Sequence, residues 1–327
     1  MTTMVLPTWR SADWRRRFKS AAAGHDTRSV RAEVFQNTLA IVRAGGYRTE
    51  NGKDVRFAPA RPEDGRLYDS ELPPIPAHAA RYETRVAVVS GDTLAFSRTL
   101  DRSAGDICAL NMASGLNPGG GVFGGAGAQE EYLFRCTDYY RTLYSFKPEF
   151  CALPEYAAEG IHPSPDGKRY PLDRNFGGCF SRGVTVFRDT EEHGYRLLDA
   201  PWKLNFVAVP AISHPATTFE RGEPRLTPEL AEATKRKMRT IFHIAWHNGQ
   251  CELVLGAFGC GAFRNPPGHI AELFCGVLAE QEFADAFRAV WFVIKEDHNS
   301  PGGGNFPPFR DVFGDGRKNF KEKGTNP

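Results

Sequence analysis

The sequence predicts an α/β fold with a largely parallel sheet, because short apolar segments of strand length alternate with segments of helical periodicity. Residues 84–93 show the pattern of a buried strand that ends in a turn, and residues 106–114 show it again. The second segment is followed by a glycine-rich loop and by apolar residues at helical spacing in residues 129–143. Residues 251–257 and 289–295 are two further buried-strand patterns. Ligands of open α/β sheets bind at the carboxyl ends of such strands.

An N-terminal helical extension is predicted before this α/β region. Residues 29–44 carry apolar side chains at helical spacing and are followed by a glycine pair, a common helix end. Residues 47–57 are expected to form a hairpin, since Asn51-Gly52 is the leading signal of a type I′ turn. Residues 58–80 contain five prolines and are expected to be an extended connector. We therefore predict an accessory helical and hairpin region over residues 1–80.

The remaining residues are expected to form one large domain, residues 81–314, and a tail, residues 315–327. The tail is polar and lysine-rich, so we expect it to be flexible. Within the domain, residues 183–188 and 205–210 predict short apolar strands. Residues 146–174 are rich in proline and glycine and predict a long surface excursion.

Two longer helices are predicted in the second half of the chain. The first begins after Thr227, a preferred N-cap residue followed by proline, and stops at Gly249. The second is expected at residues 268–283. The first helix carries four basic side chains that could contact a polyanion, although a solvated helix face is the more general explanation. These side chains are Lys235, Arg236, Lys237 and Arg239.

Composition and charge place the chain among ordinary globular proteins. It has 327 residues, 41% of them hydrophobic and 24% charged, and its net charge of +2 does not mark it as a nucleic-acid binder. Apolar runs fall short of the roughly 20 residues of a membrane span, and we expect no membrane association. The seven cysteines are scattered without a CxxC spacing. This favours reduced core thiols, no metal site, and an intracellular, cytoplasmic location (nuclear in a eukaryote).

The chemistry of the protein is expected at the glycine-rich loop, residues 117–128, between the second predicted strand and the helix that follows. Glycines let the backbone adopt positive φ and approach a ligand without a Cβ in between. The order strand, glycine loop, helix aims free N–H groups and a helix N-terminus at an anion. The loop therefore predicts a binding site for a phosphate or pyrophosphate.

Two acids, Glu130 and Glu131, follow this loop in the first turn of the predicted helix. Adjacent helical residues point about 100° apart, so only one of the two is expected to face squarely into the loop. An acid in a first turn can simply complement the helix dipole. A pair of acids beside a phosphate cradle is better explained by general acid–base catalysis.

Gly119-Gly120-Gly121, then seven residues, then Gln129-Glu130-Glu131 resemble the GGG-x(6–8)-QEE signature of poly(ADP-ribose) glycohydrolases. The flanking residues are similar to the compact microbial branch of that family, which includes bacterial and fungal members. The resemblance covers roughly residues 84–298 and is strongest at residues 106–143. It implies a macrodomain-like, three-layer α/β/α fold with a mixed, largely parallel central sheet.

The resemblance also implies roles for two glycine-rich loops. The first, residues 119–127, corresponds to the family's ribose–diphosphate loop, and residues 256–263 correspond to its second phosphate-binding loop. The implied contacts with ADP-ribose are Asp92, Asn111, Asn117, Gly119, Gly120, Gly121, Val122, Gly125, Ala126, Gly127, Gly259, Cys260, Gly261, Ala262 and Phe263.

Several of these residues have a purely structural alternative. Asp92 would bind the adenine amino group, but an aspartate after glycine is also ordinary turn chemistry. Asn111 or Asn117 would contact the distal ribose, or would only cap backbone groups. Phe263 would pack against that ribose or be a core aromatic, and Cys260 would be a small residue that fits its place. Candidates for an aromatic face beside the adenine are Phe306 and Phe309.

The chemistry implied by the resemblance is hydrolysis of a ribose–ribose O-glycosidic bond. Such a reaction passes through an oxocarbenium-like centre, and its leaving oxygen needs a proton. Glu131 is the residue implied to donate that proton and then to deprotonate the attacking water. Glu130 is expected to fix ribose hydroxyls, and Gln129 to orient the pair or the loop. No metal or cofactor is implied, and motifs such as HExxH or DxDxD do not occur.

We therefore expect a monomeric poly(ADP-ribose) glycohydrolase that releases ADP-ribose, mainly from chain ends, and so reverses ADP-ribosylation, as in a DNA damage response. Its substrates would be poly(ADP-ribose) or ADP-ribosylated protein. Two alternatives keep the same pocket. One is a non-catalytic reader of ADP-ribose, although a reader has no need of two acids. The other is a hydrolase of mono-ADP-ribose attached to protein or nucleic acid.

Overall fold

The structure is a computed structural model, and it describes residues 5–24, 26–76, 82–101, 103 and 106–314. The predicted flexible tail, residues 315–327, lies outside the described residues. Within the described part, each helix is too short or too polar to cross a membrane.

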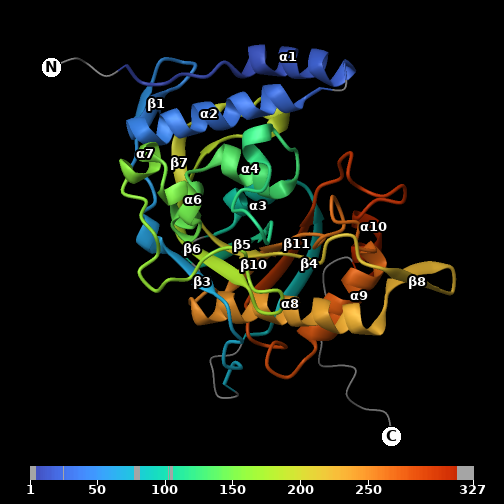
Figure 1. The fold of residues 1–327 in the computed structure, drawn as a ribbon. Coiled ribbons are helices and arrows are strands. Elements are labelled where there is room, and N and C mark those ends of the chain that lie inside the picture. The colour runs from blue at the N-terminus through green and yellow to red at the C-terminus, as the bar shows by residue number, and fades with distance from the viewer. Residues whose placement is uncertain (1–4, 25, 77–81, 102, 104–105, 315–327) are drawn as a thin grey trace, which may run out of the picture. The chain divides into compact units, whose positions relative to one another are not determined.

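Helices and strands alternate from β4 to α4 and again from α8 to α10, and elsewhere several elements of one type follow each other (Figure 1). The helices are α1 (Ser11–Ala23), α2 (Arg28–Ala44), α3 (Thr93–Thr99), α4 (Gln129–Cys136), α5 (Tyr140–Leu143), α6 (Pro148–Cys151), α7 (Pro154–Ala157), α8 (Pro228–His247), α9 (Pro267–Leu278) and α10 (Phe306–Phe313). The strands are β1 (Gly46–Arg48), β2 (Asp54–Arg56), β3 (Gly65–Tyr68), β4 (Arg85–Ser90), β5 (Ile107–Met112), β6 (Gly178–Arg188), β7 (Leu197–Val209), β8 (Thr217–Glu220), β9 (Glu223–Leu226), β10 (Glu252–Leu255) and β11 (Ala289–Ile294).

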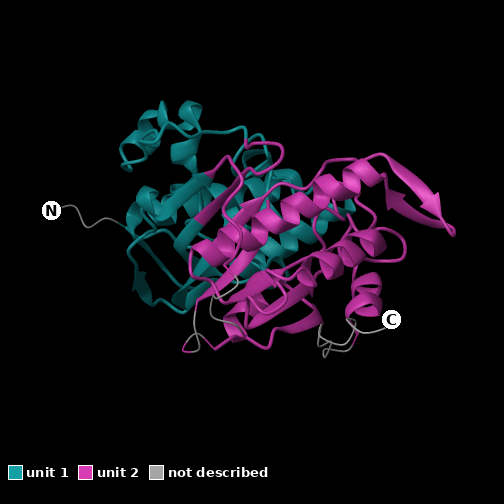
Figure 2. Cartoon of the chain, turned by 90° about the horizontal axis from the view of Figure 1, so that it is seen from below, with its two compact units in different colours: residues 1–67, 113–171, 181–205 teal, residues 68–112, 172–180, 206–327 magenta. Residues whose placement is uncertain are grey.

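The chain divides into two compact units (Figure 2), and it passes from one to the other five times. Unit 1 comprises Met1–Leu67, Ala113–Pro171 and Ser181–Asn205. Unit 2 comprises Tyr68–Met112, Leu172–Phe180 and Phe206–Pro327. The units are therefore interleaved in sequence, whereas the predicted domains, with boundaries at residues 80 and 314, are continuous segments. Those domain boundaries stay a prediction.

The central sheet has seven strands in the order β3-β6-β7-β5-β10-β11-β4 (Figure 1). The neighbouring pairs β5–β10, β10–β11 and β11–β4 are parallel. Each of these strands is a predicted apolar segment, and the segments are joined by helical connections, as parallel pairing requires. The predicted α/β class with a largely parallel sheet is confirmed.

Helices cover both faces of the strands in unit 2. Phe292 of β11 lies against Phe274 of α9, with ring centroids 5.1 Å apart, and against Phe313 of α10, at 4.6 Å. The preceding residue, Trp291, lies against Phe96 of α3, at 5.4 Å. Successive side chains of a strand point to opposite faces, so α9 and α10 lie on one face and α3 on the other. The three-layer α/β/α arrangement is thus confirmed.

The predicted helix boundaries are confirmed where capping residues mark them. The Thr227 side chain accepts a hydrogen bond from the Leu230 amide and caps α8, and Gly249 has a φ of 74° just beyond its end. In unit 1, α2 ends at Gly45, which has a φ of 61°. The predicted hairpin is confirmed as the antiparallel pair β1–β2. Its turn is not of type I′, because residues 49–53 join the two strands and, of Asn51 and Gly52, only Gly52 has a positive φ.

Elements without a clear local signal were predicted wrongly. β6 and β7 are longer than the predicted strands because they continue through polar residues that break the apolar run, such as Ser181 and Lys203. The proline-rich connector includes an edge strand, β3. The excursion at residues 146–174 is not wholly at the surface, since Tyr156 is 2% exposed and packs edge-on against Tyr144. The helix expected at residues 268–283 ends at Leu278.

Candidate active site

The glycine-rich loop folds into consecutive tight turns in unit 1. The amide of Gly120 donates to the Asn117 carbonyl, and the amide of Val122 donates to the Gly119 carbonyl. Gly119 and Gly120 have φ of 83° and 53°, values that favour glycine. A Cβ on Gly119 would lie 2.7 Å from the Phe134 ring, so the loop rests directly on α4. The predicted positive φ is confirmed at these two glycines, and their close approach to a ligand stays a prediction.

The far end of the loop presses on helix α2. Gly125 has a φ of 70°, and a Cβ there would lie 1.7 Å from the carbonyl oxygen of Arg28. A Cβ on Gly127 would lie 2.5 Å from Nη1 of Arg31. The Phe123 ring meets Phe35 of α2 edge-on, with centroids 5.1 Å apart. The N-terminal helix α2 therefore packs directly against this end of the loop.

Gly125→Ala is expected to destabilise the protein by about 2–4 kcal/mol, because the new Cβ meets fixed backbone and the residue must keep a left-handed φ. Urea unfolding of both proteins measures the difference. Gly124→Ala is the matched control, since a Cβ there meets nothing within 4 Å. A Gly125→Ala protein as stable as that control would contradict the contact with α2.

Both acids of α4 turn toward the loop. Glu130 is 4% exposed, and its two carboxylate oxygens accept hydrogen bonds from the amides of Ser114 at 2.7 Å and Gly119 at 3.1 Å. Oε1 of Glu131 accepts from the Gly121 amide at 2.8 Å. The expectation that only one acid faces the loop was therefore wrong. The loop curls around the end of the helix, so both flexible side chains reach an amide.

Glu131 differs from Glu130 in how its second oxygen is engaged. The residue is 7% exposed, and its Oε2 atom is buried without a hydrogen-bond partner among the described residues. A buried carboxylate oxygen without a partner is costly and needs an explanation, and a catalytic role is one of those found in native proteins. The Gly121 amide holds the carboxylate in place through Oε1, so Oε2 is the oxygen that lacks a partner among the described residues.

The start of α4 also offers backbone donors. The amides of Gly127 and Ala128 donate to no group of the described chain, and they lie directly before the helix that begins at Gln129. Amides at this position carry the positive end of the helix dipole. Unit 1 therefore brings together two buried carboxylates and a pair of amides suited to an anion.

The other predicted residues of the first loop differ in exposure. Val122 is fully buried, whereas the Asn117 side chain is exposed. The carbonyl of Ala126 accepts a hydrogen bond from Arg135 of α4 at 2.7 Å, and its amide donates to the carbonyl of Gly121. Gln129, the first residue of α4, is half-buried.

The second predicted phosphate loop lies in unit 2, after β10. Gly259 has a φ of 73°, and a Cβ on it would lie 2.6 Å from Nδ2 of Asn265. That amide donates to the carbonyls of Gly259 at 3.0 Å and Ile212 at 2.8 Å, which fixes the loop. Cys260 is buried, and burial raises the pKa of its thiol. Phe263 is half-buried and packs against the core of unit 2, while Gly261 and Ala262 lie toward the surface.

The remaining predicted contacts, Asp92 and Asn111, also lie in unit 2. Oδ1 of Asp92 accepts from the amides of Leu94 at 2.9 Å and Ala95 at 3.1 Å, so it caps α3. Asn111 is fully buried in β5. Phe309 is fully buried as well, in contact with Phe292, so the expectation that it offers a face to adenine was wrong. Phe306, at the start of α10, is half-buried.

Several residues around the loop were missed by sequence reasoning. Ser114 supplies an amide to Glu130, Phe134 lies beneath Gly119, and Arg135 holds the Ala126 carbonyl. Asn265 plays the corresponding part in the second loop. The sequence carried no clear signal for them, because the burial of Arg135, which makes partners necessary, is visible only in the structure.

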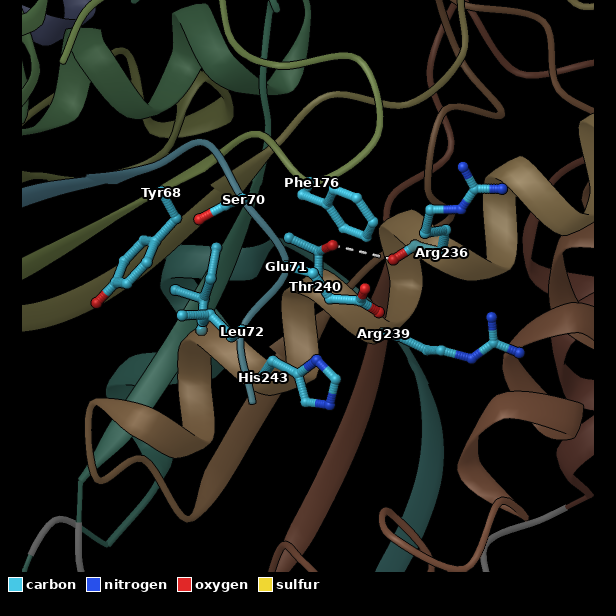
Figure 3. A pocket seen from close by; sticks show the side chains of 10 residues that line it. Tyr68, Ser70, Glu71, Leu72, Phe176, Arg236, Arg239, Thr240 and His243 are labelled. Atoms are coloured by element: carbon cyan, nitrogen blue, oxygen red, sulfur yellow. Dashed lines mark hydrogen bonds between the residues drawn. The ribbon is translucent and has the colours of Figure 1, made fainter. Parts of the chain in front are cut away.

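A pocket of about 170 Å³ lies elsewhere in unit 2, between α8, Phe176 and residues 68–72 (Figure 3). It contains none of the predicted site residues. Arg239 is held there by Glu280 and Glu232, and Arg236 donates to Asn175. These partners favour an ordinary helix surface for the basic side chains of α8. Lys237 is the exception, because it is 6% exposed, and burial lowers its pKa to about 8.

Comparisons with known proteins identify the family of the chain. A family model of the catalytic domain of microbial-type PARG matches residues 35–189. The poly(ADP-ribose) glycohydrolase of Thermomonospora curvata, solved with the inhibitor ADP-HPD, is 29% identical with a TM-score of 0.64, and the match covers 88% of this chain and 100% of that chain. The Deinococcus radiodurans enzyme, solved with ADP-ribose, is 30% identical with a TM-score of 0.57, over 77% of this chain and 95% of that chain.

Among curated proteins, the sequence found no match. The family model includes the whole glycine loop and both acids of α4. The structural matches extend over most of the chain at about 30% identity. The protein is therefore a member of the microbial-type poly(ADP-ribose) glycohydrolase family.

Proposed function

We propose that this protein is a poly(ADP-ribose) glycohydrolase that hydrolyses ribose–ribose O-glycosidic bonds and releases ADP-ribose. The observation that carries the proposal is the buried Oε2 of Glu131, which has no partner in the described chain, beside backbone amides that can bind an anion. The related Deinococcus radiodurans enzyme binds ADP-ribose in its solved structure. A buried acid next to an anion site is the arrangement that such a substrate requires.

Glu131 is the proposed proton carrier. In its protonated form it gives a proton to the leaving ribose oxygen as the bond to the anomeric carbon breaks. The resulting carboxylate takes a proton from water, whose oxygen bonds to that carbon, and the acid is restored. The Gly121 amide fixes Oε1, so the proton would travel through Oε2. Glu130, oriented by two amides, would hold ribose hydroxyls, and Gln129 would orient the pair.

The binding contacts are proposed in two groups. In unit 1, the loop at residues 119–127 would bind the diphosphate, with the amides of Gly127 and Ala128 as donors. In unit 2, residues 259–263 would form the second phosphate loop, with Phe263 against the distal ribose. Asp92 would bind the adenine amino group, and Asn111 or Asn117 the ribose hydroxyls.

We propose an intracellular, cytoplasmic location for the protein. All seven cysteines lie in the described part of the chain and are thiols rather than disulfides, and six of them are buried. Persistent free thiols are typical of reducing compartments. Cleavage from the ends of the polymer and a monomeric state are part of the same proposal.

The test is incubation of the protein with labelled poly(ADP-ribose) and, separately, with mono-ADP-ribosylated protein. We expect the polymer to be shortened and free ADP-ribose to accumulate from the earliest time points, as cleavage from chain ends requires. Binding of ADP-ribose without loss of polymer would instead identify a reader. Release from the mono-ADP-ribosylated protein alone would identify a mono-ADP-ribosyl hydrolase.

A further inference from the structure

The carbonyl of Ala126, in the glycine loop, is bound by a buried arginine of the helix that carries the acids. Arg135 is 1% exposed and lies one turn after Glu131. Its Nη1 donates to the Ala126 carbonyl at 2.7 Å, and its Nε donates to the Tyr195 hydroxyl at 2.8 Å. One guanidinium therefore ties the loop to its helix and to a residue far away in sequence.

Tyr195 passes this connection on to helix α2. It is fully buried, and its hydroxyl donates to Oε2 of Glu191 at 2.7 Å. Glu191 accepts two hydrogen bonds from Arg31 of α2, at 2.9 Å and 2.8 Å. Arg31 in turn lies against Gly127 of the loop, where a Cβ would come within 2.5 Å of its Nη1. The side chains of Arg135, Tyr195, Glu191 and Arg31 thus form a chain of contacts that begins at Ala126 and ends at Gly127.

Tyr195 is held by several hydrogen bonds although its backbone is strained. The residue has a φ of 54°, a left-handed conformation that is strained for an aromatic residue. Its carbonyl accepts from the buried Arg188 at 3.0 Å, and Arg188 also donates to Thr38 of α2. The Thr38 hydroxyl donates to the Arg135 carbonyl at 2.6 Å. Strain of this kind persists only where the surroundings enforce it, and it is concentrated at functional sites.

We propose that Arg31, Glu191, Tyr195 and Arg135, called here the support network, are positioning residues that set the glycine loop against Glu131 for catalysis. The inference rests on the proposed function and adds residues to it. Arg31 lies before, and Glu191 and Tyr195 lie after, the residues 35–189 that the family model matches. The network therefore connects side chains outside that segment to the glycine loop inside it.

The charges of the network support the same role. Arg31 pairs with the carboxylate of Glu191, whereas Arg135 donates to uncharged groups, so the four side chains of the network carry one net positive charge. Arg31 and Arg135 are both largely buried, so water screens this charge little. A buried positive charge at the back of the loop adds to the helix dipole in favouring a bound diphosphate.

The test is Tyr195→Phe, which deletes only the hydroxyl that joins Arg135 to Glu191. The matched control is Tyr47→Phe, because Tyr47 is also fully buried in unit 1 and its hydroxyl donates to a carbonyl, that of Leu198, away from the loop. We expect Tyr195→Phe to lower kcat on poly(ADP-ribose) by about 10- to 100-fold, as a misplaced catalytic group does. Tyr47→Phe should lose stability to a similar degree with kcat unchanged.

Three further variants separate positioning from folding. Glu191→Gln keeps the shape of the side chain and removes its charge. It replaces Tyr195→Phe in the comparison of kcat if that variant does not fold. Arg135→Lys can hold one partner of the two and should retain more kcat than Arg135→Met. Equal kcat in Tyr195→Phe and Tyr47→Phe, or no difference between the two Arg135 variants, would overturn the proposal.

Failure of the proposed function gives a different result. If the wild-type protein cleaves no poly(ADP-ribose), the enzymatic assignment falls, and the network is judged by ADP-ribose affinity in isothermal titration. The proposal then requires at least tenfold weaker binding in Tyr195→Phe than in Tyr47→Phe, and equal affinities refute it.

Discussion

Glu131→Gln is expected to lower turnover of poly(ADP-ribose) by at least about 10²- to 10⁴-fold, the usual contribution of a general acid–base group. The amide can still accept the hydrogen bond from Gly121 that fixes Oε1. It cannot deliver a proton to the leaving oxygen. The variant should therefore keep the shape of the loop and still bind ADP-ribose.

The measurement pairs a polymer-degradation assay with isothermal titration of ADP-ribose. Glu149→Gln is the control for the substitution itself, because the Glu149 side chain is 72% exposed on α6 of the same unit. It should match the wild type in both assays. Retained turnover in Glu131→Gln would mean that another residue is the general acid, and Glu130 would be the first candidate. Loss of both turnover and binding would instead point to a collapsed loop.

Gly120→Ala is expected to lower kcat by about 100-fold, the effect of displacing a catalytic group by roughly 1 Å. A Cβ at this position would lie 2.4 Å from Oε1 of Glu131 and 3.2 Å from Oε2 of Glu130, so at least one carboxylate must move. The φ of 53° adds backbone strain for any residue with a side chain.

Steady-state kinetics on poly(ADP-ribose), together with thermal unfolding, measures this effect. Gly124→Ala is the control in the same loop, since its Cβ would meet nothing within 4 Å and Gly124 does not have a positive φ. We expect it to keep the kcat of the wild type. Similar kcat in Gly120→Ala and Gly124→Ala would mean that the carboxylates adapt and that their placement by Gly120 is unimportant.

Local chemistry explains which parts of the fold were predictable from the sequence. α8 has a threonine cap and a glycine stop, and the β1–β2 hairpin has its Asn-Gly turn, so both were predicted from neighbouring residues. β3 was hidden by the prolines around it. The short helix α3 was missed because Asp92 was considered for adenine binding and for a turn, whereas its carboxylate caps the helix.

The site shows the same limit. The loop and its two acids are contiguous in sequence, so their spacing alone indicated the chemistry. The contact of Arg135 with Tyr195 joins residues 60 positions apart, and that of Arg31 with Glu191 joins residues 160 apart. Neither pair has a periodicity or a motif. Such contacts follow from the packing of unit 1, which a single sequence does not reveal.

The interleaving of the two units has a consequence for synthesis on the ribosome. All segments of unit 1 have been made once residue 205 has emerged, but β10 and β11, the neighbours of β5 and β4, come only afterwards. The edges of β4 and β5 that pair with β11 and β10 must therefore wait for partners encoded more than 100 residues later. The nascent protein therefore carries unpaired strand edges for much of its translation, and such edges are sites at which chains aggregate.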